Sequence, residues 1–230
     1  MFLITGASSG IGAVTARAAA AAGFRLVLAA RSQDKLRALA AELGSEQDVL
    51  PVACDVTSFV DQERLADAAV DHFGGIDIVF ANAGIGGSPG GFSGADPVHW
   101  QRMILTNVYG VGLTVRCTVA ALKAARGHVI LMGSVAGRRT LAGSMYSATK
   151  WAVSAIGYGL REELRGSGVR VTLIEPGMVD TPFFDTPKPD GLRAEDVARS
   201  VMFAVSQPPT VDVHELLLYP TPPTDDKGAI

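Results

Sequence analysis

Tyr146 and Lys150 are the two residues whose types and spacing are best suited to chemistry. They lie four residues apart in a segment with helical character, so both side chains project from the same helix face. A phenol has a pKa near ~10, and a neighbouring ammonium lowers that pKa because it favours the phenolate. Lowering it to about 7 requires ~4 kcal/mol of differential interaction, which a half-buried cleft can supply. We therefore predict that Tyr146 is an acid–base group whose pKa is lowered by Lys150.

Ser134 lies twelve residues before Tyr146, just after the apolar run 128–132. If that run is a strand, Ser134 follows its carboxyl end, where open parallel sheets bind their ligands. Its hydroxyl can donate a hydrogen bond to a carbonyl oxygen of a substrate. The Tyr–Lys pair alone is a weak signal, so its interpretation depends on the elements that position it.

The N-terminus supplies a second motif. An apolar strand over residues 1–5 runs into a glycine-rich turn, and an alanine-rich helix over 13–22 follows and stops at Gly23. Such a turn lets backbone N–H groups approach a pyrophosphate, and the helix N-terminus adds partial positive charge. The candidate cofactor residues here are Gly6, Ser8, Ser9, Gly10, Ile11 and Gly12. A tight turn without a ligand is the alternative.

The spacing Thr-Gly-x-x-x-Gly-x-Gly over residues 5–12, together with the Tyr–Lys pair, resembles the single-domain branch of the short-chain dehydrogenase/reductase family. The resemblance extends over nearly the whole chain. It implies hydride transfer between a nicotinamide cofactor and a carbonyl or alcohol carbon. Tyr146 would transfer the hydroxyl proton, Lys150 would also hold the nicotinamide ribose, and Ser134 would polarise the carbonyl. Asn107 matches the family residue that bends its helix and sustains a proton relay, although a capped kink without catalysis remains an alternative.

The residues that follow the second predicted strand, 24–30, indicate whether the cofactor is NAD(H) or NADP(H). An NAD-specific site needs an acid there to hold the ribose 2′-hydroxyl. This chain has Ala30 and then Arg31, and a guanidinium can clamp a 2′-phosphate with two hydrogen bonds. We therefore predict NADP(H). The alternative is an arginine that merely starts a solvated helix face.

The resemblance implies further cofactor contacts. Asp55 and Val56 match the adenine-binding pair, and Asp55 could cap the helix over 58–73 instead of, or in addition to, that role. In the family's Asn-Asn-Ala-Gly segment, Ala81 replaces the first Asn, and the retained Asn82 would brace the central sheet beside the cofactor. The retained residues are Asn82, Ala83 and Gly84, and those of the later Pro-Gly segment are Pro176, Gly177, Val179 and Thr181. Backbone at Val179 would meet the carboxamide, and the Thr181 hydroxyl would meet the pyrophosphate.

Seven apolar segments alternating with helices predict a single-domain, Rossmann-type doubly wound parallel sheet over residues 1–219, with a loose tail over 220–230. The predicted strands are 1–5, 24–30, 49–54, 76–81, 128–132, 169–175 and 213–218. The predicted helices are 13–22, 32–43, 58–73, 97–125, 143–166 and 194–206, and a loop is predicted over 85–96.

The substrate is less clearly encoded. The chain's ending, with Glu195-Asp196-Val197 and a last strand before Tyr219-Pro220, resembles the NADP-dependent subgroup that oxidises 3-hydroxy acids. Arg138 and Arg139 stand where a substrate carboxylate could be met, or they form a solvated pair. The alternatives are an NADPH-dependent reductase of bulkier uncharged ketones or aldehydes and, in another class, a non-catalytic NADP(H) sensor. Loops 85–96, 137–145 and 182–192 would line the pocket, with Phe183 and Phe184 as candidates for a lid.

Length and composition narrow the function classes. A chain of 230 residues with 48% hydrophobic residues can bury one α/β core. A net charge of −3 with scattered basic residues argues against a nucleic-acid surface. Two cysteines, Cys54 and Cys117, are too few for a disulfide framework, so we expect a reduced cytoplasmic setting. The histidines show no metal-ligand spacing. We expect no signal peptide, because Phe2-Leu3-Ile4 already reads as the first strand, and no membrane span, because no apolar run approaches ~20 residues.

The resemblance also implies a homo-oligomer, a tetramer or dimer, held by the helix after Ser134 and the long helix before it. Small and apolar residues on the former fit such a contact, although ordinary core packing fits them nearly as well. These residues are Trp151, Ala155, Ile156 and Gly159.

Overall fold

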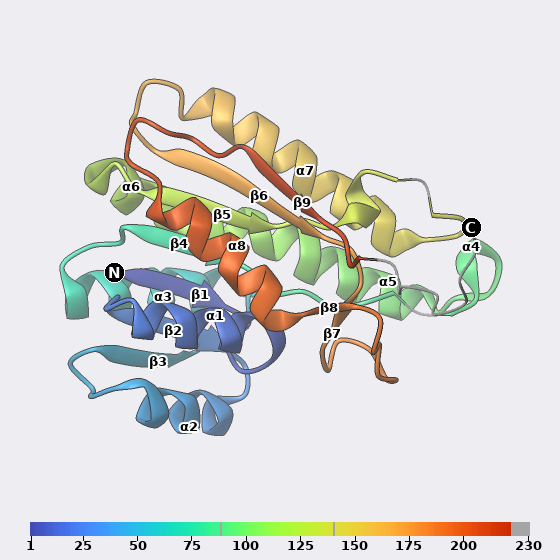
Figure 1. The fold of residues 1–230 in the computed structure, drawn as a ribbon, viewed down its shortest axis with the longest axis horizontal. Coiled ribbons are helices and arrows are strands. Elements are labelled where there is room, and N and C mark those ends of the chain that lie inside the picture. Colours follow the sequence, from blue (N-terminus) through green and yellow to red (C-terminus); the bar gives the residue numbers. More distant parts are fainter. Residues whose placement is uncertain (88, 140, 222–230) are drawn as a thin grey trace, which may run out of the picture.

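The computed structural model describes residues 1–87, 89–139 and 141–221, and Figure 1 shows them as one layered α/β domain. The tail expected over 220–230 lies outside the described residues from 222 onward. A central sheet crosses the molecule, with helices on both of its faces (Figure 1).

The sheet has seven parallel strands in the order β3-β2-β1-β4-β5-β6-β9. The strands are β1 (Phe2–Thr5), β2 (Leu26–Ala30), β3 (Val49–Ala53), β4 (Ile78–Ala81), β5 (His128–Met132), β6 (Arg170–Pro176) and β9 (Glu215–Leu218). The predicted doubly wound fold is therefore confirmed. Successive strands run outward from β1 to β3 and then from β4 to β9, so the order reverses between β1 and β4, where a crevice forms at the carboxyl ends.

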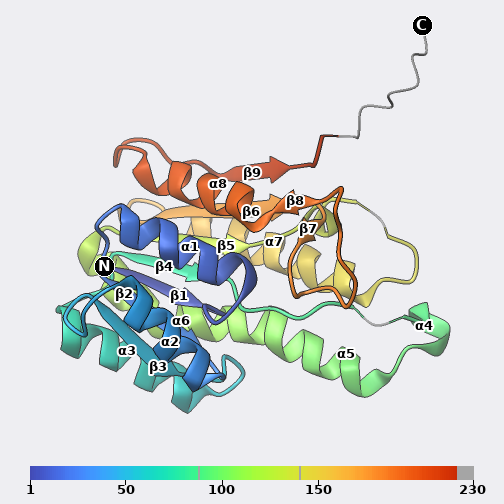
Figure 2. The same cartoon turned by 60° about the horizontal axis from the view of Figure 1, so that its bottom comes forward.

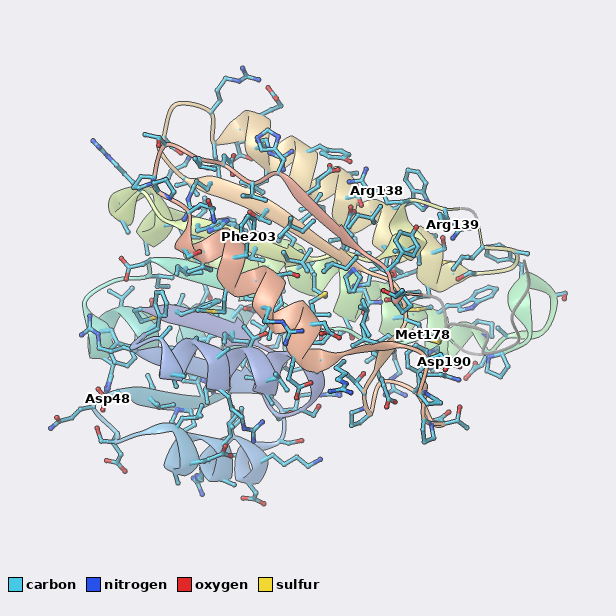
Figure 3. All side chains as sticks on the ribbon, in the orientation of Figure 1. Asp48, Arg138, Arg139, Met178, Asp190 and Phe203 are labelled. Atoms are coloured by element: carbon cyan, nitrogen blue, oxygen red, sulfur yellow. The ribbon has the colours of Figure 1, made fainter. Side chains whose placement is uncertain are left out.

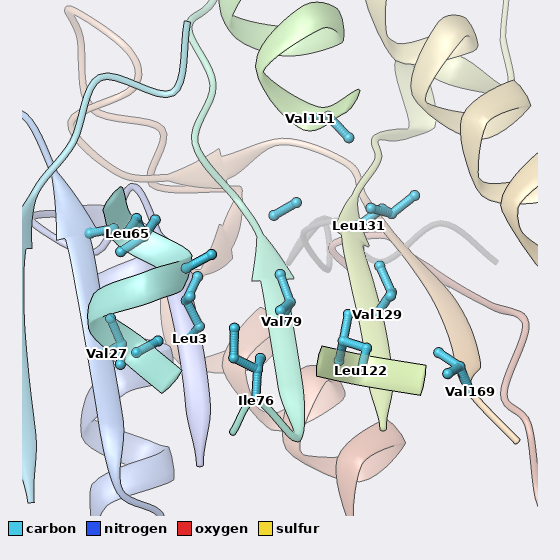
Figure 4. Packing of buried hydrophobic residues seen from close by; sticks show 14 of the residues in the cluster. Leu3, Val27, Leu65, Ile76, Val79, Val111, Leu122, Val129, Leu131 and Val169 are labelled. Atoms are coloured by element: carbon cyan, nitrogen blue, oxygen red, sulfur yellow. The ribbon is translucent and has the colours of Figure 1, made fainter. Parts of the chain in front are cut away.

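Two hydrophobic clusters hold the helices against the sheet. Helices α1 (Gly10–Ala21), α2 (Gln33–Leu43) and α8 (Ala194–Ser206) cover one face. Helices α3 (Phe59–Phe73), α6 (Gly110–Ala125) and α7 (Met145–Glu163) cover the other. Along β1, Leu3 contributes to one cluster while Phe2 and Ile4 contribute to the other, because side chains alternate across a strand. Figure 4 shows Leu3, Val79 and Val129 packed beneath α3 and α6, and Figure 2 shows α1 beside α8.

The long helix expected over 97–125 is present with one irregularity. It consists of α5 (Pro97–Ile104), a π-helical turn η1 (Leu105–Tyr109) and α6. Asn107 is the buried residue of the π turn. π turns inside α-helices are frequent at functional sites, because the extra residue re-aims the side chains around it. The bend implied by the resemblance is therefore a π turn.

The segment Pro97–Ala125 is also long and apolar enough, by length and composition, to cross a membrane, contrary to the expectation that no such run exists. Its buried side packs against α3 and against strands β4 and β5, which is the placement of a core helix. Length and composition alone are weak evidence for a membrane span.

Several boundaries differ from the prediction. The expected loop over 85–96 contains a single-turn helix, α4 (Gly91–Gly94), and α7 is shorter at both ends than the expected 143–166. A small parallel ribbon, which was not predicted, pairs β7 (Val179–Asp180) with β8 (Leu192–Arg193). A 3₁₀ turn, η2 (Val135–Gly137), follows Ser134. These short elements carry too few periodic residues to be recognised from sequence.

Candidate active site

The glycine turn between β1 and α1 is shaped by close backbone approach. Gly6 and Gly10 have positive φ angles of 66° and 53°, where side chains are strained. A Cβ at Gly12 would lie 2.4 Å from the Gly6 carbonyl oxygen, so only glycine fits there. Asn82 closes the turn from β4, because its Nδ2 donates to the Thr5 carbonyl at 2.9 Å. The predicted bracing by Asn82 thus has a geometric basis at the junction of β1 and β4.

The turn also has the features of an anion site. Ser9 is the residue before α1, yet its hydroxyl caps no backbone N–H of the helix. Ser8, Ser9, Gly10 and Ile11 line the crevice, and the first N–H groups of a helix have no partner within it and carry its partial positive charge. These residues fit the pyrophosphate of a dinucleotide.

A cavity of about 870 Å³ runs along the crevice at the carboxyl ends of the strands. Nearly all residues predicted to bind the cofactor or to act in catalysis line it. They are Gly6, Ser8, Ser9, Gly10, Ile11, Arg31, Asp55, Val56, Asn82, Ala83, Gly84, Ser134, Tyr146, Lys150, Pro176, Gly177, Val179 and Thr181. Gly12 and Asn107 are the exceptions, since both are buried behind the wall. The topology therefore brings seven separate segments of the sequence to one cavity.

Arg31 and Asp55 lie at the β2–β3 end of this cavity. Burial tends to raise the pKa of Asp55, but hydrogen bonds from the backbone and hydroxyl of Thr57, together with the nearby Arg31 charge, hold it below its usual value. Asp55 does not cap α3. Ser58 does, because its hydroxyl accepts from the Asp61 N–H at 3.2 Å. The alternative interpretation of Asp55 as a helix cap is wrong, because Asp55 lies three residues before the cap residue Ser58 and its carboxylate accepts hydrogen bonds from Thr57 instead.

Ser134, Tyr146 and Lys150 meet where β5 ends and α7 begins. The Ser134 hydroxyl accepts from the Ala136 N–H at 3.1 Å and contacts the Pro176 carbonyl at 3.4 Å. Lys150 is buried, and its Nζ donates to the Met132 carbonyl at 2.7 Å. Burial lowers the pKa of Lys150 to about 8. A serine hydroxyl, a phenol and an ammonium are thus held on one wall of the cavity.

The expected effect of Lys150 on Tyr146 is not present in this geometry. Burial raises the pKa of Tyr146 to about 12, and its interaction with the Ser134 hydroxyl opposes this only in part. The Lys150 Nζ lies 5.7 Å from the centre of the Tyr146 ring and is bonded to a backbone carbonyl instead. The prediction of a phenol with a pKa near 7 is therefore wrong here, and Tyr146 is a neutral phenol at neutral pH.

Asn107 connects three elements from behind the cavity wall. Its Oδ1 accepts from the Ile85 N–H at 2.9 Å, and its Nδ2 donates to the Ile85 carbonyl at 3.0 Å. The same Nδ2 donates to the Thr149 hydroxyl at 3.2 Å, on α7 next to Lys150. Asn107 thereby fixes the segment after Gly84 relative to the helix that carries Tyr146. Its part in a proton relay stays a prediction.

The wall next to Tyr146 is apolar. The Phe183 ring packs edge-on against Tyr146, with ring centres 5.8 Å apart, and also closely approaches Gly86. Leu141 and Met178 line the same cavity, and Figure 3 labels Met178 beside the β7–β8 segment. Phe183 and Phe184, predicted as lid residues, both line the cavity.

Several residues that line the cavity were not predicted, among them Arg102, Leu105 and Thr106 from α5 and the π turn. Arg102, Leu105 and Thr106 lie three and four residues apart and so share one helix face with each other. Asn107 is not on that face, so the match at Asn107 could not have identified them.

Arg138 and Arg139 are not in the cavity lining, and they do not form a solvated pair. Arg138 is bound to Glu175 and Glu215, whereas Arg139 is exposed (Figure 3). Neither is therefore placed to meet a substrate carboxylate. Sequence adjacency suggested a pair, but the turn after η2 separates the two side chains.

Of the four α7 residues predicted to form a subunit contact, three are exposed and one packs against the core. Trp151, Ala155 and Gly159 are exposed at helical spacing, whereas Ile156 packs against the core. An exposed stripe of this kind fits a contact between subunits. The homo-oligomer itself stays a prediction.

Replacing Lys150 by methionine should stabilise the protein. Because the folded-state pKa of Lys150 lies below its unfolded value of 10.5, the folded state binds fewer protons between pH 8 and 10.5. The free energy of unfolding of the wild type therefore rises with pH across this window. Below pH 8 Lys150 is charged in the folded state, and burial of that charge destabilises the fold. After loss of the Met132 hydrogen bond we expect a net gain of about 1 kcal/mol at pH 7 for Lys150→Met.

Thermal unfolding at pH 7 and at pH 10.5 measures this effect. The advantage of Lys150→Met should shrink at the higher pH, and Lys123→Met, at an exposed position of α6, should show no such pH dependence. A variant that is less stable than wild type at pH 7 would contradict the prediction.

Comparisons with known proteins agree with this geometry. A family model described as short chain dehydrogenase matches residues 1–190. An uncharacterized oxidoreductase of Staphylococcus haemolyticus is 37% identical over 223 residues, covering 95% of this chain and 96% of the relative.

Solved structures give the same result. An alcohol dehydrogenase from the archaeon Thermococcus sibiricus, complexed with 5-hydroxy-NADP, has a TM-score of 0.88 and 32% identity, covering 95% of this chain and 96% of its own. A serine dehydrogenase complexed with NADP+ has a TM-score of 0.89 and 28% identity, covering 100% and 99%. A 3-ketoacyl-(acyl-carrier-protein) reductase from Brucella melitensis, complexed with NADH, has a TM-score of 0.86 and 30% identity, covering 94% and 95%.

Proposed function

The chain belongs to the short-chain dehydrogenase/reductase family of oxidoreductases, and from this premise we propose that it is an NADP(H)-dependent enzyme acting on a carbonyl or secondary alcohol of a small substrate. The observation that supports this most directly is the convergence of Ser134, Tyr146 and Lys150 on the cavity that also holds the glycine turn. A non-catalytic NADP(H) sensor would not need an acid–base group beside a hydrogen-bond donor in that cavity.

The bound cofactor supplies or accepts the hydride, and the protein's residues provide orientation and protons. Tyr146, as a neutral phenol, is in the form that donates a proton to a carbonyl oxygen. The Ser134 hydroxyl donates to the same oxygen and stabilises the charge that develops there. Lys150 would hold the ribose of the bound cofactor near Tyr146, and Asn107 would position the segment opposite and serve the proton relay. Because the neutral phenol protonates a carbonyl oxygen and the phenolate deprotonates an alcohol, the rate of oxidation should rise relative to that of reduction as the pH increases.

The preference for NADP(H) rests on Arg31. Solved relatives carry either NADP+ or NADH, so family membership supports a nicotinamide cofactor of either type. In this chain an exposed guanidinium lines the cavity directly after β2, where an NAD site needs a carboxylate. Asp55, the nearby acid, is already bonded to Thr57. A 2′-phosphate is the ligand that this arrangement suits.

Two substrate classes remain as proposals. Similarity to a serine dehydrogenase supports a 3-hydroxy acid. Among the described residues that line the cavity, however, the basic side chains are Arg31, Arg102 and Lys150. With Arg31 and Lys150 assigned to the cofactor, a substrate carboxylate would have to meet Arg102. The apolar wall formed by Phe183 and Leu141 instead favours an uncharged ketone or aldehyde.

A panel of substrates tests the proposal. NADPH absorbance would be followed with uncharged ketones and aldehydes, and NADP+ reduction with 3-hydroxy acids and uncharged alcohols, each repeated with NAD(H). Turnover of acids alone would support the hydroxy-acid class and direct attention to Arg102. Turnover of uncharged carbonyls alone would exclude that class. If the protein binds NADPH but turns over no substrate of the panel, the result would contradict the proposed enzymatic function and support a non-catalytic NADP(H) sensor.

A further inference from the structure

Glu175 is a fully buried carboxylate behind the cavity wall that carries Ser134, Tyr146 and Lys150. It is the second-last residue of β6, directly before Pro176, and has an exposed fraction of 0%. The Ser154 hydroxyl on α7 donates to its Oε1 at 3.0 Å. A buried carboxylate costs several kcal/mol unless it is paired and hydrogen-bonded, so its partners are decisive.

Arg138 is the charged partner. Its Nε donates to both oxygens of Glu175, each at 2.8 Å, and its Nη2 lies 2.7 Å from a carboxylate oxygen of Glu215 on β9. The guanidinium also lies over the Tyr158 ring of α7, 5.3 Å from the ring centre. The hydrogen bond to Glu175 and the other contacts raise the pKa of Arg138 further, so it is always charged. Figure 3 shows Arg138 between α7 and the β6–β9 edge.

Arg138 is the last residue of the turn 133–138, which carries Ser134 and which we call the catalytic turn. Ser134 precedes η2 and Arg138 follows it, and the Arg138 N–H donates to the Val135 carbonyl at 2.9 Å. The turn is packed tightly: a Cβ at Gly133 would lie 2.7 Å from Cγ of Glu175, and one at Gly137 would lie 2.7 Å from the Lys150 carbonyl oxygen. The turn therefore rests on Glu175 on one side and on the Lys150 backbone on the other.

We propose that Arg138 and Glu175 form a positioning pair that fixes Ser134 against Tyr146 and Lys150. The pair joins the catalytic turn to β6 through Glu175, to α7 through Ser154 and Tyr158, and to β9 through Glu215. Stability alone does not explain such a pair, because well-packed apolar residues often replace a buried ion pair without loss. An Nε–H group shared between both oxygens of Glu175, with Nη2 beside Glu215, instead restricts where the turn can lie. Small displacements of a reacting group cost large factors in rate.

The proposal rests on the proposed function, so its test includes a readout that needs no substrate. The Ala136 amide donates to the Ser134 hydroxyl, and the exchange of that amide with solvent deuterium therefore reports the position of Ser134 directly. The variants are Arg138→Met, Glu175→Gln and the double variant Arg138→Met/Glu175→Gln. The double variant removes the arginine without leaving an unpaired buried charge, which separates positioning from stability.

Arg161→Met is the matched control. Arg161 lies on α7, and its guanidinium, like that of Arg138, lies over the Tyr158 ring, 5.9 Å from the ring centre. It donates to the Val171 and His214 carbonyls and makes no bond to Glu175. Thermal unfolding, kcat, KM and exchange of the Ala136 amide would be measured for all variants.

We expect Arg138→Met to lose thermal stability and the double variant to recover most of it. The double variant should still show an Ala136 amide that exchanges about tenfold faster and a kcat lowered about tenfold or more, with KM nearly unchanged. Arg161→Met should keep wild-type kcat and Ala136 exchange. A double variant with wild-type exchange and kcat would overturn the proposal. If wild type turns over no substrate, the proposed function fails, and the exchange measurement still decides whether the pair positions Ser134.

Discussion

Tyr146→Phe should reduce turnover by ~10³-fold while leaving cofactor binding nearly intact. The hydroxyl is the only group removed, and with it goes the proton that a substrate oxygen must receive or give up. The ring remains, so its edge-on contact with Phe183 and the shape of the cavity are retained. Steady-state kinetics with the best substrate of the panel measures kcat, and quenching of protein fluorescence by NADPH measures cofactor affinity.

Tyr109→Phe provides the control, because Tyr109 is exposed and lies outside the cavity. It should keep wild-type turnover. Near-normal rates in Tyr146→Phe would show that another group transfers the proton, and the proposed mechanism would then be wrong. A loss of NADPH affinity in step with the loss of rate would assign the tyrosine to binding instead.

Arg31→Asp should reverse the cofactor preference, with affinity for NADPH falling by about 10²-fold. The change removes the guanidinium that would clamp the 2′-phosphate and places a repelling carboxylate beside it. The same carboxylate can accept hydrogen bonds from a free ribose diol, so affinity for NADH should rise. The ratio of kcat/KM for NADPH to that for NADH measures the switch.

Arg37→Asp makes the same charge change at an exposed position one turn into α2, outside the cavity. It should leave the cofactor preference as in wild type, which separates a local contact at Arg31 from the effect of net charge. If Arg31→Asp keeps the wild-type preference for NADPH, or if wild type prefers NADH, the assignment of Arg31 is wrong.

The fold and the outline of the site could be predicted from sequence because they depend on local patterns. Continuous apolar runs of four or five residues, such as Ile78–Ala81 and Leu26–Ala30, are strands buried on both faces of a parallel sheet. The glycines of the first turn are required by backbone geometry that only glycine adopts, and a spacing of four residues places Tyr146 and Lys150 on one helix face whatever the surroundings. These features are encoded within a few residues of one another.

The protonation states and the charge partners were decided by the tertiary structure. Lys150 lies on the same helix face as Tyr146, but the end of β5 places the Met132 carbonyl within reach of its Nζ, so burial controls the pKa of the phenol. Arg138 was predicted as a substrate ligand or a solvated residue, and its actual partners come from β6 and β9. A side chain's electrostatic environment depends on groups brought close by folding from distant parts of the chain, and no spacing along the sequence encodes those distances.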